Sequence, residues 1–321
     1  MAISTTGATT LTDNEFTNVS NMEKITIATT TDNISLTTGG AFSSAFTSGV
    51  TVTVADLDDA NTFTYDGGLY SGDTTISVTS DAVADGAAED VTVTSNSGAD
   101  TVTLTFASWV GAGGDGGSII VNTRAGDDTI TVTQGDLAAN TTSQAVTITG
   151  GTGADTITLS ANDNGTGASA MSVLVIADGD SLVGSRDKIT NYNLGDGTDQ
   201  ADILDFDTGA VGTLATSTDQ GVILSHNIAN GVATFDDAAA YAAELIINAS
   251  NLSDTLDYIE ANANTNGVVA FEYDSSGNGV NDATMVYHNG TENSLVELVG
   301  VTGATTVATT AVTANMIGIG A

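Results

Sequence analysis

One short pattern, a glycine followed by an aspartate and then by alternating apolar residues, occurs three times at a nearly constant step. Its aspartates are Asp100, Asp128 and Asp155, so the steps are 28 and 27 residues. Apolar residues two positions apart precede and follow each turn, as at Ile130 and Val132. This alternation is typical of a half-buried β-strand. Each unit is therefore predicted to be a strand, a Gly-Asp turn and a second strand.

The constant step predicts how the units are arranged. One unit cannot bury its apolar row alone, whereas units stacked at a fixed period bury one another. We therefore predict a predominantly all-β chain organised as a parallel β-roll or β-solenoid, with coils of about 27 residues. Weaker copies of the pattern begin at Ile25, and Ile76/Val78 lie within a longer interval. Val173 and Val175 follow Val146/Ile148 by 27 residues and are predicted to be the last matching pair.

Composition divides the chain into three parts. Residues 1–24 are polar and are predicted to form an N-terminal cap. Residues 25–205 are predicted to form the solenoid, and the composition changes after Phe206. Residues 206–321 are predicted to form a smaller β-rich C-terminal domain with one or two short helices and a hairpin.

The C-terminal part contains the clearest helical signals of the chain. Asp236 and Asp237 are suited to the start of a helix, and an alanine-rich run follows as far as Ile247. Ser253 is a predicted N-cap for a helix over residues 254–260. From Gly267 the pattern returns to strand, with strands predicted at 268–273, 284–288 and 294–299.

Charge is the strongest compositional signal. The chain has 40 Asp+Glu against 4 Lys+Arg, and its formal net charge is −36. Such a charge argues against nucleic acid or an anionic membrane as partner. Hydrophobic residues reach 40%, which excludes a disordered acidic tail. Divalent cations are the obvious means of neutralising this charge, and backbone and carboxylate oxygens at the Gly-Asp turns are the hard ligands that Ca²⁺ prefers.

The third copy of the repeat is similar to a known family. Residues 150–158 match Gly-Gly-x-Gly-x-Asp-x-(apolar)-x in full and resemble the calcium-binding repeats of RTX, or hemolysin-type, proteins. The resemblance implies Ca²⁺ bound between successive turns of a β-roll. The step departs from that family, whose rolls repeat at a shorter interval, so the sharing of ligands between adjacent loops is in question. The predicted ligands of the three turns are Gly98, Asp100, Gly126, Asp127, Asp128, Gly151, Gly153 and Asp155.

Two further segments carry calcium predictions. Residues 185–206 resemble the segment that closes the roll in the same family, and residues 274–282 have the spacing of a compact Ca²⁺ loop. A solvated acidic turn is an equal alternative for the first segment, with a local salt bridge at Arg186 or Lys188. A Gly-Asn hairpin turn is the alternative for the second. The predicted ligands are Asp187, Asp196, Asp199 and Asp202 in the first segment and Asp274, Ser276, Asn278 and Asp282 in the second.

The inventory of reactive residues argues against an enzyme. The chain has no cysteine and two histidines, His226 and His288. Residues 179–182 spell Gly-Asp-Ser-Leu, the nucleophile block of a hydrolase class, but neither histidine stands in the Asp-x-x-His pattern of those enzymes. Ser181 is therefore predicted to be a turn residue.

Threonine rows offer another function. Stacked Thr-x-Thr strands, as at 101–105 and 129–133, present an array similar to the one that β-solenoid ice-binding proteins use. The plain alternative is that threonine is β-branched and suits an outward-facing strand position.

These observations together predict a structural role. We expect no Sec-type signal peptide at the start of the chain, and the sequence contains no apolar run that could span a bilayer. Resemblance to RTX proteins implies type I secretion from a Gram-negative bacterium, with an uncleaved secretion signal within residues 206–321. We expect a secreted, Ca²⁺-stabilised protein that self-assembles into an extracellular surface layer or filament, with itself and cell-surface polysaccharide as partners. A Ca²⁺-dependent adhesin module and an ice-binding solenoid are the alternatives.

Overall fold

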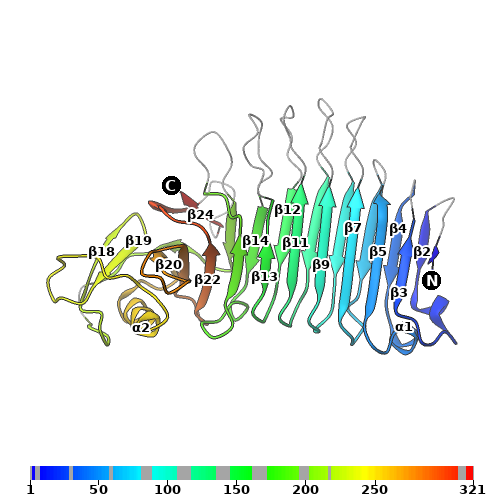
Figure 1. Cartoon of the computed structure of the whole chain (residues 1–321), viewed down its shortest axis with the longest axis horizontal. Coiled ribbons are helices and arrows are strands. Elements are labelled where there is room, and N and C mark those ends of the chain that lie inside the picture. Colours follow the sequence, from blue (N-terminus) through cyan, green and yellow to red (C-terminus); the bar gives the residue numbers. More distant parts are fainter. Residues whose placement is uncertain are drawn as a thin grey trace, which may run out of the picture. The chain divides into compact units, whose positions relative to one another are not determined.

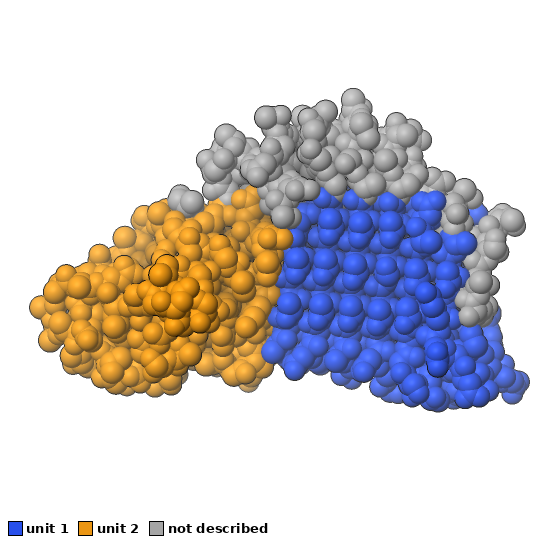
Figure 2. Space-filling model, viewed as in Figure 1, with its two compact units in different colours: residues 1–173, 198–200 blue, residues 174–197, 201–321 orange. Residues whose placement is uncertain are grey.

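The computed structural model describes residues 2–3, 8–28, 32–57, 61–80, 89–106, 117–134, 145–160, 172–194, 202–215, 218–309 and 316–320. The chain forms two compact units. Unit 1 comprises residues 1–173 and 198–200, and unit 2 comprises residues 174–197 and 201–321 (Figure 2). The domain boundaries expected at residues 25 and 206 stay predictions, and each unit is described by itself.

Unit 1 confirms the predicted parallel β-solenoid, whose coils are about 28 residues long (Figure 1). Two strands from each coil enter two separate parallel ladders. The first ladder, called ladder A, runs in the order β1 (Ala2–Ile3), β3 (Lys24–Ile27), β5 (Val50–Leu57), β7 (Thr74–Ser80), β9 (Thr101–Phe106), β11 (Thr129–Gln134) and β13 (Thr156–Thr158). The second, called ladder B, runs in the order β2 (Thr9–Leu11), β4 (Ile34–Thr37), β6 (Thr62–Asp66), β8 (Asp90–Thr94), β10 (Ser118–Asn122) and β12 (Ala145–Thr149).

The solenoid core lies between these ladders and consists of stacked apolar rows. In β11, Ile130 and Val132 point inward and are 0% and 2% exposed, while the threonines beside them point outward. Pairing is in register, so Ile130 stacks on Val102 of β9 and on Ile157 of β13. The period-two alternation of the sequence therefore maps directly onto an inner and an outer face.

Two details of the repeat differ from expectation. The interval around Ile76 is one complete coil, because β7 pairs with both β5 and β9. In β14 (Ser172–Ile176) the predicted inward pair is wrong: Leu174 and Ile176 are buried, while Val173 and Val175 are half-buried. The coil that leads to β14 is one residue longer than predicted, and a slip of one residue exchanges the two faces of a strand.

The N-terminal segment takes part in both ladders, because β1 pairs with β3 and β2 pairs with β4. Two short helical elements, η1 (Asp13–Phe16) and α1 (Gly40–Ala45), accompany this end. The Asp13 carboxylate accepts hydrogen bonds from the N–H groups of Ala41 and Phe42 at 3.1 and 2.7 Å, and so caps α1. The two elements also pack through aromatic rings, with the ring centroids of Phe16 in η1 and Phe42 in α1 4.8 Å apart.

Unit 2 contains a mixed sheet and a second, smaller group of strands. The sheet has the order β15 (Asp187–Thr190), β22 (Ser294–Val299), β21 (Ala283–His288), β20 (Gly267–Tyr273), β19 (Val232–Asp236) and β18 (Ser225–Ala229), and β17 (Ala210–Val211) also pairs with β20. The smaller group contains β16 (Ile203–Phe206), β24 (Met316–Gly320) and β23 (Thr306–Thr309) in antiparallel pairs. The three strands predicted after Gly267 are confirmed as β20, β21 and β22.

Only one of the two helices predicted in this unit is present. Helix α2 (Leu252–Asn262) begins after Asn251, so the predicted N-cap at Ser253 is wrong. The helix predicted from Asp236 to Ile247 is also wrong, because no residue between β19 and α2 is helical. The Asp236 carboxylate accepts hydrogen bonds from the N–H groups of Ala238, Ala242 and Ala243 and holds the alanine-rich segment in a loop. These bonds lower the pKa of Asp236.

Candidate functional site

The aspartates of the repeated turns form one buried column, each directly before a strand of ladder A. Asp100, Asp128 and Asp155 are each 1% exposed. The Oδ1 atom of each accepts a hydrogen bond from an N–H group one coil earlier. The distances are 2.6 Å from Thr74 N to Asp100, 2.7 Å from Asp100 N to Asp128 and 2.9 Å from Asp128 N to Asp155. We call these three residues the aspartate ladder, and it ties successive turns together.

Glycines of the same turns stack backbone on backbone. Gly126 and Gly153 have φ values of +136° and +144°, which L side chains rarely adopt. A Cβ atom on Gly126 would overlap the carbonyl oxygen of Gly98, and one on Gly153 would overlap that of Gly126. A Cβ atom on Gly151, at a φ of +90°, would overlap the Arg124 carbonyl oxygen. The glycines of the motif are thus required by the close approach of the coils.

Burial has an electrostatic consequence for the aspartate ladder. Desolvation raises the pKa of Asp128 to about 6, although the hydrogen bond from Asp100 N–H acts in the opposite direction. Negative charge on Asp100 and Asp127 raises it further, and desolvation also raises the pKa of Asp100. The Thr123 side chain also lowers the pKa of Asp128, but the Oδ2 atom of Asp128 accepts no hydrogen bond of good geometry among the described residues. The nearby Thr123 hydroxyl donates to the Gly150 carbonyl oxygen at 2.9 Å. A proton or a cation could satisfy this oxygen.

Each aspartate among the predicted calcium ligands of the three turns has a carboxylate oxygen that already accepts a backbone hydrogen bond. The Oδ1 atom of Asp127 accepts a hydrogen bond from Ala154 N at 2.9 Å, and the carbonyl oxygens of Gly98 and Gly126 lie against the next glycine. Within the described ranges, no three acidic or histidine side chains lie close enough together to hold a metal ion. Calcium at these turns stays a prediction, and Asp128 Oδ2 is a buried oxygen that could still receive an ion.

Only two of the four calcium ligands predicted in residues 185–206 belong to the part of the chain that the structure describes. Asp187 and Asp202 are buried, at 1% and 3% exposure, whereas Asp196 and Asp199 lie outside the described residues. The Oδ2 atom of Asp202 accepts a hydrogen bond from Asn193 N at 2.9 Å. The two buried aspartates lie inside unit 2, and calcium binding by this segment stays a prediction.

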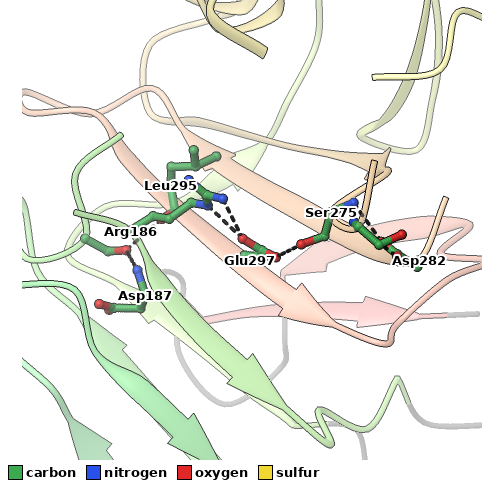
Figure 3. Close-up of polar contacts among 8 residues, drawn as sticks. Arg186, Asp187, Ser275, Asp282, Leu295 and Glu297 are labelled. Carbon is green, nitrogen blue, oxygen red and sulfur yellow. Dashed lines mark hydrogen bonds and ion pairs between the residues drawn. The ribbon is translucent and has the colours of Figure 1, made fainter. Parts of the chain in front are cut away.

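Arg186 forms an ion pair, but with a partner far away in the sequence rather than a local one. Its Nη2 atom lies 2.8 Å from Oε2 of Glu297 in β22 (Figure 3). Glu297 is 1% exposed and also accepts a hydrogen bond from the Ser275 hydroxyl at 2.5 Å. This pair joins β22 to the segment before β15 and to the hairpin that follows β20.

The hairpin loop of residues 274–282 is held by its own aspartates. Asp274 accepts hydrogen bonds from the N–H groups of Gly277, Asn278 and Gly279 at 2.7, 3.0 and 2.7 Å. Asp282 accepts from Ser275 N at 2.7 Å and from Ser276 N at 3.3 Å. The backbone thus satisfies both carboxylates, as the hairpin alternative requires. Ser276 and Asn278, the other two predicted ligands, lie on the same loop, and calcium binding there stays a prediction.

The residues considered for catalysis have other partners. The Ser181 hydroxyl is fully buried, donates to the Leu295 carbonyl oxygen at 2.6 Å and accepts from Asp187 N at 2.7 Å. His226 shares a hydrogen bond of 2.8 Å with the Tyr258 hydroxyl. His288 is 1% exposed and stacks on Phe206 with ring centroids 4.9 Å apart; burial lowers its pKa. No nucleophile and base stand together among these three side chains.

No protein-family model, characterised protein or solved structure matches this chain. The resemblance to RTX repeats therefore stays a prediction from residues 150–158. Within the part of the chain that the structure describes, no helix is long and apolar enough to cross a membrane.

Proposed function

We propose that this chain is a secreted structural protein that assembles with copies of itself outside the cell, as a surface layer or a filament. The observation that carries the proposal is the pair of in-register parallel ladders, which begin at β1 and β2. Within the described residues, each of these two strands pairs on one side only. An unpaired strand edge is a template for another chain.

The proposal includes calcium because the chain is strongly negatively charged. The formal net charge is −36. In the part of the chain that the structure describes, Arg186 forms an ion pair with Glu297, but the few basic residues leave most of the acidic charge uncompensated. Copies of such a chain repel one another unless counter-ions reduce the charge. Bound Ca²⁺ would lower this repulsion and would stabilise the turns. Low calcium in the cytosol and high calcium outside would then restrict folding and assembly to the exterior.

The outer edge of β2 offers a specific test. Thr9 N donates to Asn33 O at 2.9 Å, so the backbone groups of Thr9 point toward β4. Successive residues of a strand point in alternate directions, so the N–H group of Thr10 points outward, away from the ladder. Replacing Thr10 by proline removes this one donor and leaves the bonds to β4 in place.

We expect Thr10→Pro to retain the circular dichroism spectrum and thermal unfolding of the parent protein but to lose most of its Ca²⁺-dependent polymer. Sedimentation and electron microscopy measure the polymer. Thr92→Pro, in the interior strand β8, is the control and should reduce the stability of the fold itself. Undiminished assembly by folded Thr10→Pro would exclude this edge as the contact.

A further inference from the structure

The outward face of ladder A carries an unbroken array of hydroxyl-bearing side chains. It spans five coils, from β5 to β13. Every outward position in its first two columns is threonine except Ser77, and a shorter third column runs from β7 to β11, because the bulge of β5 places Ala55 and Asp56 beyond Thr53. We call this array the threonine face. Its columns across the coils are Thr51, Thr75, Thr101, Thr129 and Thr156; Thr53, Ser77, Thr103, Thr131 and Thr158; and Thr79, Thr105 and Thr133.

The outward face of ladder B provides an internal comparison. Its corresponding positions include Asp66, Asp90, Asn122 and the 42% exposed Ile120. β-propensity acts on both ladders alike and does not explain why only one is uniform. The chain contains 40 Asp+Glu, yet none lies in these columns, and Asp56 lies beside them at the bulge of β5. This uniformity indicates a surface with a function of its own.

The threonine face is a regular lattice. Neighbouring strands lie about 4.8 Å apart, and alternate residues along a strand are separated by about 6.6 Å. Threonine is β-branched and has few side-chain rotamers, and the core behind it is closely packed, with Val102 and Ile130 both 0% exposed. Side chains of unit 1 accordingly lie in parallel rows across the coils (Figure 2). Hydroxyl and methyl groups therefore repeat at fixed positions in two directions.

These properties exclude several kinds of ligand. The face lacks charged groups that would bind an ion or a charged polymer. It has no aromatic ring on which a sugar could stack. Five strands and three columns at these spacings cover a few hundred Å², well below the roughly 800 Å² per partner that a stable protein interface needs. The ligand that remains is one that is itself uncharged, rigid and periodic.

We propose that the threonine face binds ice. Water molecules held by its hydroxyl groups, with methyl groups between them, would be spaced at the strand repeat, which approaches the repeat of water molecules in hexagonal ice. An uncharged surface suits this ligand because charged groups order liquid water around themselves in other arrangements. This binding goes beyond the structural function proposed above, since it requires one folded copy and no assembly.

Thermal hysteresis, the gap between the melting and freezing temperatures of a single ice crystal, tests the proposal on the full chain folded in Ca²⁺. We expect the parent protein to shape ice crystals and to produce a measurable gap. Thr103→Tyr, in the middle of the face, should lose most of it. Thr92→Tyr makes the same change on the outward face of ladder B and should retain the parent value. Circular dichroism confirms that each variant is folded.

If Thr103→Tyr does not fold, Thr103→Ser replaces it, because serine keeps the hydroxyl group and removes only the methyl group; we expect a reduced gap. Absence of hysteresis in the folded parent protein would overturn the proposal. An equal loss in Thr92→Tyr would do so too. Binding to microcrystalline cellulose, or Thr103-dependent self-association, without hysteresis would overturn it in favour of a polysaccharide or of a second copy.

Discussion

Gly126→Ala is expected to destabilise unit 1 by about 2–4 kcal/mol, because it combines backbone strain with overpacking. The residue has a φ of +136°, and an added Cβ atom would overlap the Gly98 carbonyl oxygen of the preceding coil. That atom belongs to the backbone and cannot move without separating two coils. Chemical denaturation followed by circular dichroism measures the loss.

Gly40→Ala is the matched control for this prediction. Gly40 begins α1 in the same unit, and a Cβ atom there would meet nothing within 4 Å. Alanine in a helix is favoured over glycine, so the variant should be as stable as the parent or more stable by up to about 1 kcal/mol. Equal stability of Gly126→Ala and the parent would show that the turns do not stack as closely as described.

Asp128→Asn is expected to stabilise the protein at pH 7, by about 1–2 kcal/mol after allowance for solvent screening. The buried carboxyl group has a pKa raised to about 6, so folding favours its protonated form. The stability that this group contributes is fully present below its unfolded pKa of 3.8 and is lost as the pH rises through about 6. Asparagine is neutral throughout and retains an oxygen that can accept the hydrogen bond from Asp100 N.

The measurement is the free energy of unfolding between pH 4 and pH 7 in EGTA, so that no bound cation contributes, with a stabilising osmolyte such as trimethylamine N-oxide added to keep the chain folded. The parent should lose stability with rising pH in that window relative to Asp128→Asn. Asp128→Ala is the control, since it leaves the buried Asp100 N–H without its acceptor and should be about 1–3 kcal/mol less stable than Asp128→Asn at every pH. Parallel pH curves for the parent and Asp128→Asn would contradict the raised pKa.

The sequence was sufficient to predict the solenoid because its strongest signal is local and repeated. Alternation such as Ile130-Thr131-Val132 determines which side chains point inward, and the fixed step of the turns determines that the coils stack. The same reasoning gave the wrong face in β14, where Leu174 rather than Val173 is buried. Period alone does not give the length of each connection, and one residue is enough to reverse a strand.

The helix predicted at Asp236 was wrong for a different reason. Alanine favours a helix, but tertiary contacts override so weak a preference. Here the Asp236 carboxylate binds three N–H groups of the segment that follows it. The packing of Phe16 in η1 against Phe42 in α1 was also missed, since their contact joins residues from separate coils and no local pattern signals it.

The aspartates of the repeat show that a sequence motif can predict the alignment of side chains without predicting what those side chains bind. Spacing predicted that Asp100, Asp128 and Asp155 would be aligned, and they are. Both an ion and a backbone N–H group can satisfy a carboxylate, and the sequence does not distinguish them. The structure reveals the N–H partners, and these account for one oxygen of each side chain.

The most direct test of a calcium-stabilised, self-assembling structural protein is circular dichroism combined with electron microscopy of the purified chain, first in EGTA and then with millimolar Ca²⁺. We predict a largely unfolded chain in EGTA, and β-structure with ordered layers or filaments after Ca²⁺ is added. A chain that is fully folded in EGTA and remains monomeric in Ca²⁺ would contradict the proposed function. The threonine face would then be the surface on which to look for function.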